Sequence, residues 1–95
     1  MKNHTKIYLK YFDYGNHQDV FIPCEVCNSR AVDIHHIDPR GSGGDPNASK
    51  DVIGNLAALC RKCHNRVEES KEENDKLKYS HELLIEVYER INKSN

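Results

Sequence analysis

Four cysteines constrain this chain more than any other feature, because they form two pairs of the same spacing. The pairs are C-E-V-C (Cys24 and Cys27) and C-R-K-C (Cys60 and Cys63). Four thiolates arranged in this way suit tetrahedral Zn²⁺ and leave it no open position, so the pattern predicts a structural zinc site. A disulfide pair or unligated core thiols are the alternatives. Residues 28–59 separate the pairs, more than the roughly 15–20 residues of common zinc ribbons, so a folded unit is expected between them.

The composition of the chain also favours a metal staple. With 95 residues, 37% of them hydrophobic and none of them Trp, the chain can bury only a small core. We expect a single domain over residues 1–95. There is no pattern of a secretory signal and no apolar run long enough to span a membrane. A cytoplasmic protein (in the host cytoplasm if phage-encoded) with reduced thiols and no membrane partner is therefore expected.

Between the cysteine pairs the sequence predicts a β-hairpin. Residues 31–37 alternate as in a strand, so His35 and His36 are expected to point to opposite faces. If both serve one site, the strand must bend or end at the pair, and the Asp-Pro dipeptide at 38–39 supplies such an end. A loop rich in Gly and Pro follows, and the apolar segment 52–60 returns as the second arm.

Helical spacing predicts helices on both sides of this hairpin. The first has Thr5 as its N-cap and Gly15 just past its C-terminus. A second helix covers about residues 61–70 and is followed by a charged spacer, K-E-E-N-D-K. The C-terminal helix covers about residues 80–92, with Ser80 as its N-cap. Its apolar stripe, expected to pack within the domain or across a dimer, consists of Leu84, Val87, Tyr88 and Ile91.

Chemically active residues fall between and beside the cysteine pairs in a particular order. A His-His pair in V-D-I-H-H-I is followed by Asn55 and by a histidine directly after the second cysteine pair, in G-N-L-A-A-L-C-R-K-C-H. With C-E-V-C ahead of them, these motifs resemble the HNH endonuclease family over about residues 22–68. The resemblance implies a zinc-stapled ββα-metal (His-Me finger) fold of class α+β with flanking helices. It also implies metal-dependent hydrolysis of DNA, expected to be double-stranded.

The resemblance implies a role for each matching residue. His35 corresponds to a ligand of a catalytic divalent cation, and His36 to the general base that takes a proton from water. Asn55 corresponds to the residue that holds the hairpin loop and the base in position, and in some members binds the metal. His64 corresponds to a further ligand. Glu68 stands where some members have another histidine, so it either ligates or lies on the helix surface.

These residue types suit such chemistry by themselves. A histidine with an ordinary pKa near 6.5 can accept a proton from water at neutral pH. A cation held by two or three protein groups keeps positions open for a phosphate oxygen and the leaving group. A carboxylate at Glu68 would suit Mg²⁺ or Mn²⁺, and Ni²⁺ or Zn²⁺ are the other candidates. An isolated histidine pair, in contrast, is usually a surface or structural feature.

The charge of the chain does not identify a partner. The net charge is −1, so a DNA-facing surface would have to be a local basic patch. A non-catalytic zinc-binding module with a decayed HNH site, binding nucleic acid or protein, is the alternative function. A homodimer or a partner protein could supply specificity. His4, His17 and His81 belong to no pattern and are assigned no role. The candidate nucleic-acid contacts are Arg40, Arg61, Lys62 and Arg66.

Overall fold

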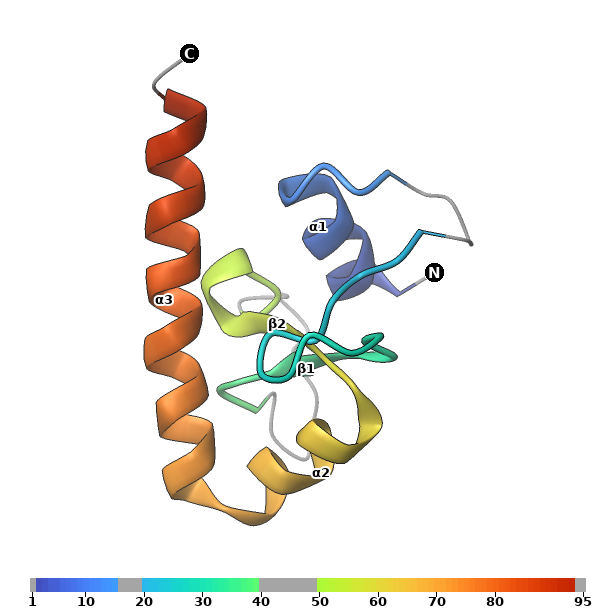
Figure 1. The fold of residues 1–95 in the computed structure, drawn as a ribbon, viewed down its shortest axis with the longest axis vertical. Helices are drawn as coiled ribbons and strands as arrows, with labels where there is room; N and C mark the ends of the chain where they lie inside the picture. Colours follow the sequence, from blue (N-terminus) through green and yellow to red (C-terminus); the bar gives the residue numbers. More distant parts are fainter. Residues whose placement is uncertain (1, 16–19, 40–49, 94–95) are drawn as a thin grey trace.

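The expected hairpin lies at the centre of the molecule, with the long helix α3 along one side (Figure 1). The structure is a computed structural model that describes residues 2–15, 20–39 and 50–93. Its two strands, three α-helices and short 3₁₀ helix confirm the α+β class. In chain order the elements are α1 (Asn3–Tyr11), β1 (Asp33–His36), η1 (Ile53–Asn55), β2 (Leu56–Leu59), α2 (Arg61–Glu69) and α3 (Lys71–Lys93).

The strands β1 and β2 pair antiparallel, and their register places His35 opposite Ala57 and His36 opposite Leu56. Ala57 belongs to the apolar cluster shared with α2 and α3, whereas Leu56 belongs to the cluster shared with α1. The two histidines therefore point to opposite faces, as the alternation predicts. The strand β1 ends at His36, just before the break expected at 38–39.

The strand β2 is buried along its whole length because helices cover both of its faces. Tyr8 of α1 packs on one face, and Val67 of α2 and Leu77 of α3 pack on the other. Burial on both faces explains why this segment, L-A-A-L, is continuously apolar rather than alternating. Leu56 and Leu59 are both 0% exposed. Each such leucine contributes about 1.5–3 kcal/mol relative to an exposed one.

The boundaries predicted for the N-terminal helix are wrong at both ends. The helix α1 begins at Asn3, so Thr5 lies inside its first turn and is not the N-cap. His4 in that turn is only 8% exposed, and its packing favours the earlier start. At the other end Asp13, with a φ of 61°, takes the left-handed position expected of Gly15. Two backbone hydrogen bonds of the Schellman type close the helix there.

The C-terminal helix α3 is longer than predicted and includes residues 71–76. The charged run is not a spacer, and Ser80 is not an N-cap but an interior residue. The hydroxyl of Ser70 accepts a hydrogen bond from the N–H of Glu73 at 3.2 Å, as an N-cap side chain does, so the start signal lies ten residues earlier. Two i,i+4 ion pairs within the charged run support the helix further.

The apolar stripe of α3 packs within the described structure only in part. Tyr88 contacts Phe12, with ring centroids 5.0 Å apart. Leu84, Val87 and Ile91 are exposed by 40%, 51% and 62%. The expectation of packing inside the domain therefore holds for one member of the stripe.

None of the described helices has both the length and the apolar character needed to cross a membrane.

A buried pair of titratable groups connects α3 to the first cysteine pair. Nδ1 of His81 lies 2.6 Å from Oε1 of Glu25, and Nε2 of His81 donates to the carbonyl of Ile53 at 2.7 Å. Glu25 also accepts hydrogen bonds from the hydroxyl of Tyr8 and the N–H of Ala58. The network joins α1, the hairpin and α3 at one carboxylate. His81, to which the sequence assigned no role, is thus a structural residue.

The pKa of His81 makes this pair sensitive to pH. Burial by itself lowers the pKa of His81, but the hydrogen bond and charge of Glu25 outweigh burial and raise it above its ordinary value. In the unfolded chain the pKa of a histidine is about 6.5. The stability that the pair contributes is therefore fully present below about pH 6.5 and is lost as pH rises through the folded pKa of His81.

We expect Glu25→Gln to lower the free energy of unfolding by about 3–5 kcal/mol, because His81 loses its buried charged partner. The stability of the wild type should decline as pH rises above about 6.5 and through the raised pKa of His81, and this decline should be weaker in the variant. Thermal unfolding in zinc-containing buffer measures both effects. The control is Glu86→Gln, which removes an exposed pair with Arg90 and should change stability by no more than about 0.5 kcal/mol. Equal effects of the two substitutions would contradict this assignment.

Candidate active site and metal cluster

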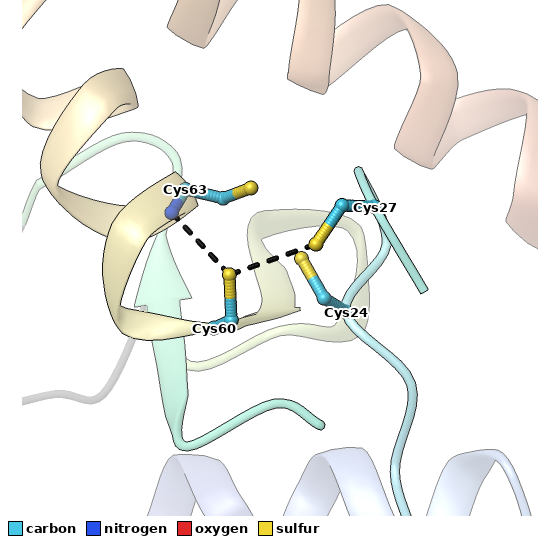
Figure 2. Close-up of side chains that lie close together, drawn as sticks. All are labelled: Cys24, Cys27, Cys60 and Cys63. Atoms are coloured by element: carbon cyan, nitrogen blue, oxygen red, sulfur yellow. Dashed lines mark hydrogen bonds between the residues drawn. The ribbon is translucent and has the colours of Figure 1, made fainter. Parts of the chain in front are cut away.

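The four cysteines gather at the base of the hairpin, and Figure 2 shows their sulfur atoms turned toward one another. Their Sγ atoms all lie within 4.8 Å of one another, and those of Cys27 and Cys60 are 3.7 Å apart. Sulfurs around a tetrahedral Zn²⁺ with bonds of about 2.3 Å lie about 3.8 Å apart. None of the four forms a disulfide. The cluster therefore has the number, type and spacing of donors needed to hold a metal such as zinc.

Backbone N–H groups shape each cysteine pair for this purpose. The N–H two residues after Cys24 donates to its sulfur, and the N–H of Cys63 donates to the sulfur of Cys60, both at 3.4 Å. Asn28 closes the first turn with a φ of 67°, as its residue type predicts. The Cys63 N–H and the Ser29 hydroxyl lower the pKa of Cys60 to about 6. Burial raises the pKa of Cys63 to about 12, so its thiolate needs a cation beside it.

The two histidines of the pair line one cavity, although they leave β1 on opposite faces. The cavity has a volume of about 490 Å³ and is also lined by His64 and Glu68 of α2. The ring centroids of His35 and His64 are 5.0 Å apart, and Nε2 of His64 lies 3.2 Å from a carboxylate oxygen of Glu68. The ligand atoms of His35, His64 and Glu68 do not all lie within 4.8 Å of one another. Binding one cation between them requires a side-chain rotation.

Asp33 determines which nitrogen of His64 carries a proton. Nδ1 of His64 lies 2.9 Å from Oδ2 of Asp33, and because a carboxylate only accepts, Nδ1 is the protonated nitrogen. Nε2, 3.2 Å from a carboxylate oxygen of Glu68, is then the nitrogen left to bind a cation, which would take the place of a proton between these two atoms. Arg61 binds the same carboxylate at 3.1 Å, so this candidate phosphate contact is held in an ion pair. Asp33 was not among the residues predicted for the site, although its position two residues before His35, on the same face of the strand, is a signal for it.

Asn74 of α3 determines which nitrogen of His35 carries a proton. Its Nδ2 donates to the carbonyl of Ile37 at 2.9 Å, which orients the amide so that Oδ1 faces Nε2 of His35 at 2.9 Å. Because an amide oxygen only accepts, Nε2 of His35 carries the proton and Nδ1 keeps the lone pair. Burial lowers the pKa of His35 below its ordinary value, more than the Asn74 bond raises it. The neutral ring that a metal needs is therefore favoured.

His36 faces α1 and the segment that precedes η1. Its Nε2 lies 2.7 Å from Oδ1 of Asp51, so Nε2 carries the proton and Nδ1 keeps the lone pair. The side chain of Asn3 donates to the other oxygen of Asp51 at 3.0 Å. The ring of His4 meets that of His36 edge to face, with centroids 4.6 Å apart. Neither His4 nor Asp51 was predicted as a site residue, because only the tertiary structure brings α1 and the segment before η1 to His36.

Asn55 ties together the two ends of the hairpin loop. Its Oδ1 accepts from the N–H of Asp38 at 2.7 Å, and its Nδ2 donates to the carbonyls of Asp38 and Lys50, each at 3.0 Å. These bonds engage both ends of the amide, and Asn55 does not line the histidine cavity. The geometry thus suits the support of the loop. It does not place Asn55 as a ligand of a cation among the histidines.

The remaining basic candidates lie on the surface or outside the described residues. Lys62 and Arg66 are exposed on α2, beside Arg61. Arg40 lies outside the described residues, as does His17. Contact of these arginines and this lysine with DNA stays a prediction.

We expect the purified protein to carry zinc in its cysteine cluster, and Cys60→Ser to lose both the zinc and the native fold. Chelation should unfold the wild type, because the free energy of metal binding is part of the free energy of folding. Metal analysis together with circular dichroism measures this. The control is His35→Ala, which should keep the fold and the cysteine-bound zinc. A Cys60→Ser protein with the zinc content and helicity of the wild type would refute the structural role.

Comparison with protein families agrees with this geometry. Residues 24–70 match the sequence model of the HNH endonuclease family. The matched segment contains both cysteine pairs, the hairpin and α2, and it nearly coincides with the resemblance over about residues 22–68. No curated protein and no solved structure matches the chain. Through this segment, the protein belongs to the HNH endonuclease family.

Proposed function

We propose that this protein is a metal-dependent endonuclease that hydrolyses phosphodiester bonds of DNA, with His36 as the general base. The supporting observation is the single cavity that contains His36 together with His35, His64 and Glu68 on the family's ββα unit. Double-stranded DNA is the expected substrate, and a 5′-phosphate and a 3′-hydroxyl are the expected products by resemblance to the family.

The lone pairs in the cavity indicate how a divalent cation would be held. Nδ1 of His35 and Nε2 of His64 are the nitrogens left to bind a cation, and Glu68 adds a carboxylate oxygen beside His64. A bound divalent cation supplies charge stabilisation for the phosphate and for the leaving oxygen. Imidazole together with carboxylate is compatible with Mg²⁺, Mn²⁺, Ni²⁺ or Zn²⁺.

His36 takes the proton of the attacking water on Nδ1, the nitrogen that keeps its lone pair. Asp51 accepts the hydrogen bond from Nε2, so it holds the ring in place and stabilises the imidazolium that forms. Asn55 assists indirectly, because it binds the carbonyl of Lys50, the residue before Asp51. A base positioned in this way contributes about 10²–10⁴-fold to the rate.

We do not favour the alternative, a non-catalytic module with a decayed site. Asp33, Asn74 and Asp51 each fix the proton of one histidine in the cavity. A module that only binds its partner has no need of such control over protonation. We further propose that Lys62 and Arg66 of α2 contact DNA phosphates.

We expect the zinc-loaded protein to convert supercoiled plasmid to the nicked form with Mg²⁺, Mn²⁺ or Ni²⁺, and His36→Ala to nick about 10²–10⁴-fold more slowly. The loss follows from removal of the proton acceptor while the cation ligands remain. Initial rates from gel densitometry measure it, and Glu86→Gln on the exposed face of α3 is the matched control. If folded wild-type protein leaves the plasmid uncut with all three metals, the catalytic proposal fails.

We also expect Asp33→Asn to weaken binding of the catalytic cation by about 10–100-fold, because His64 loses the carboxylate that orients its ring. The measurement is the Mn²⁺ concentration that gives half-maximal nicking. At saturating Mn²⁺ the rate should approach that of the wild type. Arg61→Gln keeps the bond between Asp33 and His64 and should shift the metal requirement much less. An unchanged metal requirement in Asp33→Asn would disprove the orienting role.

A further inference from the structure

A second group of metal-type donors lies on the α1 side of the hairpin. One ring nitrogen of His4, one of His36 and a carboxylate oxygen of Asp51 lie within 4.8 Å of one another. They come from α1, from the last residue of β1 and from the segment before η1. His4 lies outside residues 24–70, the segment that matches the family. The group is also separate from the candidate cation ligands on the other face of the hairpin.

The donor types of this group suit zinc better than magnesium. Two imidazoles and one carboxylate form a donor set typical of zinc sites that keep a fourth position for water. Around a tetrahedral Zn²⁺ with bonds of about 2.1 Å, the donors lie about 3.4 Å apart. Nε2 of His36 and Oδ1 of Asp51 are 2.7 Å apart, so they would need to separate by less than about 1 Å. Mg²⁺ prefers a shell of oxygens and water.

Packing holds the three side chains of this group in place, and a cavity gives an ion access to them. The side chains of His36 and Asp51 are 13% and 6% exposed, so their positions are restricted by packing. Asn3 donates to Oδ2 of Asp51, the oxygen that does not face His36, and thereby orients the carboxylate. His4 and His36 also line the cavity of about 490 Å³, which gives an ion a route to them.

We propose that His4, His36 and Asp51 form an inhibitory Zn²⁺ site that removes His36 from catalysis. Zn²⁺ would take the place of the proton on Nε2 of His36 that faces Asp51, and that proton would move through solvent to Nδ1 of the same ring. A neutral imidazole has one proton, so a ring bound to metal through Nε2 keeps its proton on Nδ1. Nδ1 is the nitrogen that accepts the proton of water under the proposed function. His36 then can no longer accept the proton of water, although the cavity stays open.

The binding of zinc can be tested without reference to catalysis. The background is zinc-loaded His64→Ala protein, in which the candidate catalytic site is disabled and the cysteine cluster is filled. Equilibrium dialysis against Zn²⁺ should show one additional zinc per chain, and excess Mg²⁺ should not compete. His4→Gln and Asp51→Asn in this background should each weaken the additional site at least about 10-fold. Lys6→Gln, on the exposed side of α1, is the control.

Equal additional zinc in the background protein and in both of these variants would overturn the site. Circular dichroism identifies any variant that fails to fold. The two substitutions lie in different parts of the fold. If one variant fails to fold, zinc binding by the other variant still tests the site. His4→Gln keeps a side chain of similar size that accepts hydrogen bonds, and Asp51→Asn keeps the shape of the carboxylate.

The inhibitory effect rests on the proposed function and has its own readout. Plasmid nicking at saturating Mg²⁺ is measured against added Zn²⁺, and each protein is normalised to its own rate without added zinc. Wild type and Lys6→Gln should lose activity at the same zinc concentration, and His4→Gln should require at least about 10-fold more. Equal zinc sensitivity of wild type and His4→Gln would overturn the inhibition.

The two readouts separate failure of the inference from failure of the proposed function. A protein that cuts plasmid but binds no additional zinc overturns the site and leaves the nuclease proposal standing. A protein that binds the additional zinc but cuts no plasmid with any metal overturns the inhibitory role and supports the site alone.

Discussion

The cysteine cluster at the base of the hairpin is the contact on which the rest of the structure depends. It joins the loop before β1 to the start of α2, two segments that are far apart in sequence. Glu25, inside the first cysteine pair, extends this anchor to α3 through His81 and to α1 through Tyr8. A small apolar core would not by itself hold these helices around two short strands. The positions of the site residues thus depend on four sulfurs and one buried carboxylate.

The histidines of the cavity are oriented by groups from three different parts of the fold. Asp33 on β1 orients His64, Asn74 on α3 orients His35, and Asp51 before η1 orients His36. Each partner accepts a hydrogen bond from one ring nitrogen, so the lone pair available for chemistry is that of the other nitrogen. In the proposed mechanism these lone pairs serve either a cation or a water molecule. The same arrangement explains why zinc at Nε2 of His36 would stop catalysis without filling the cavity.

Local sequence signals predicted the hairpin, α2 and the opposite directions of His35 and His36, because these features follow from the period of a strand and from residue types. The same signals failed at helix ends. Ser80 resembled an N-cap, yet the capping hydrogen bond at Ser70 and the ion pairs of the charged run extend α3 through it. Thr5 failed in a similar way, because the packing of α1 on the hairpin favours an earlier start.

The sequence by itself determined the donor types and their spacing: two cysteine pairs, a histidine pair at the end of a strand, and a histidine after the second cysteine pair. Residue types and short spacings of this kind can be recognised directly in the sequence. Only the tertiary structure decided that His4, Asp51 and Asn74 meet the histidine pair. Periodicity predicts which face of a strand a side chain occupies, but not which distant segment covers that face. The covering segments, α1 and α3, are set by burial of β2 from both sides.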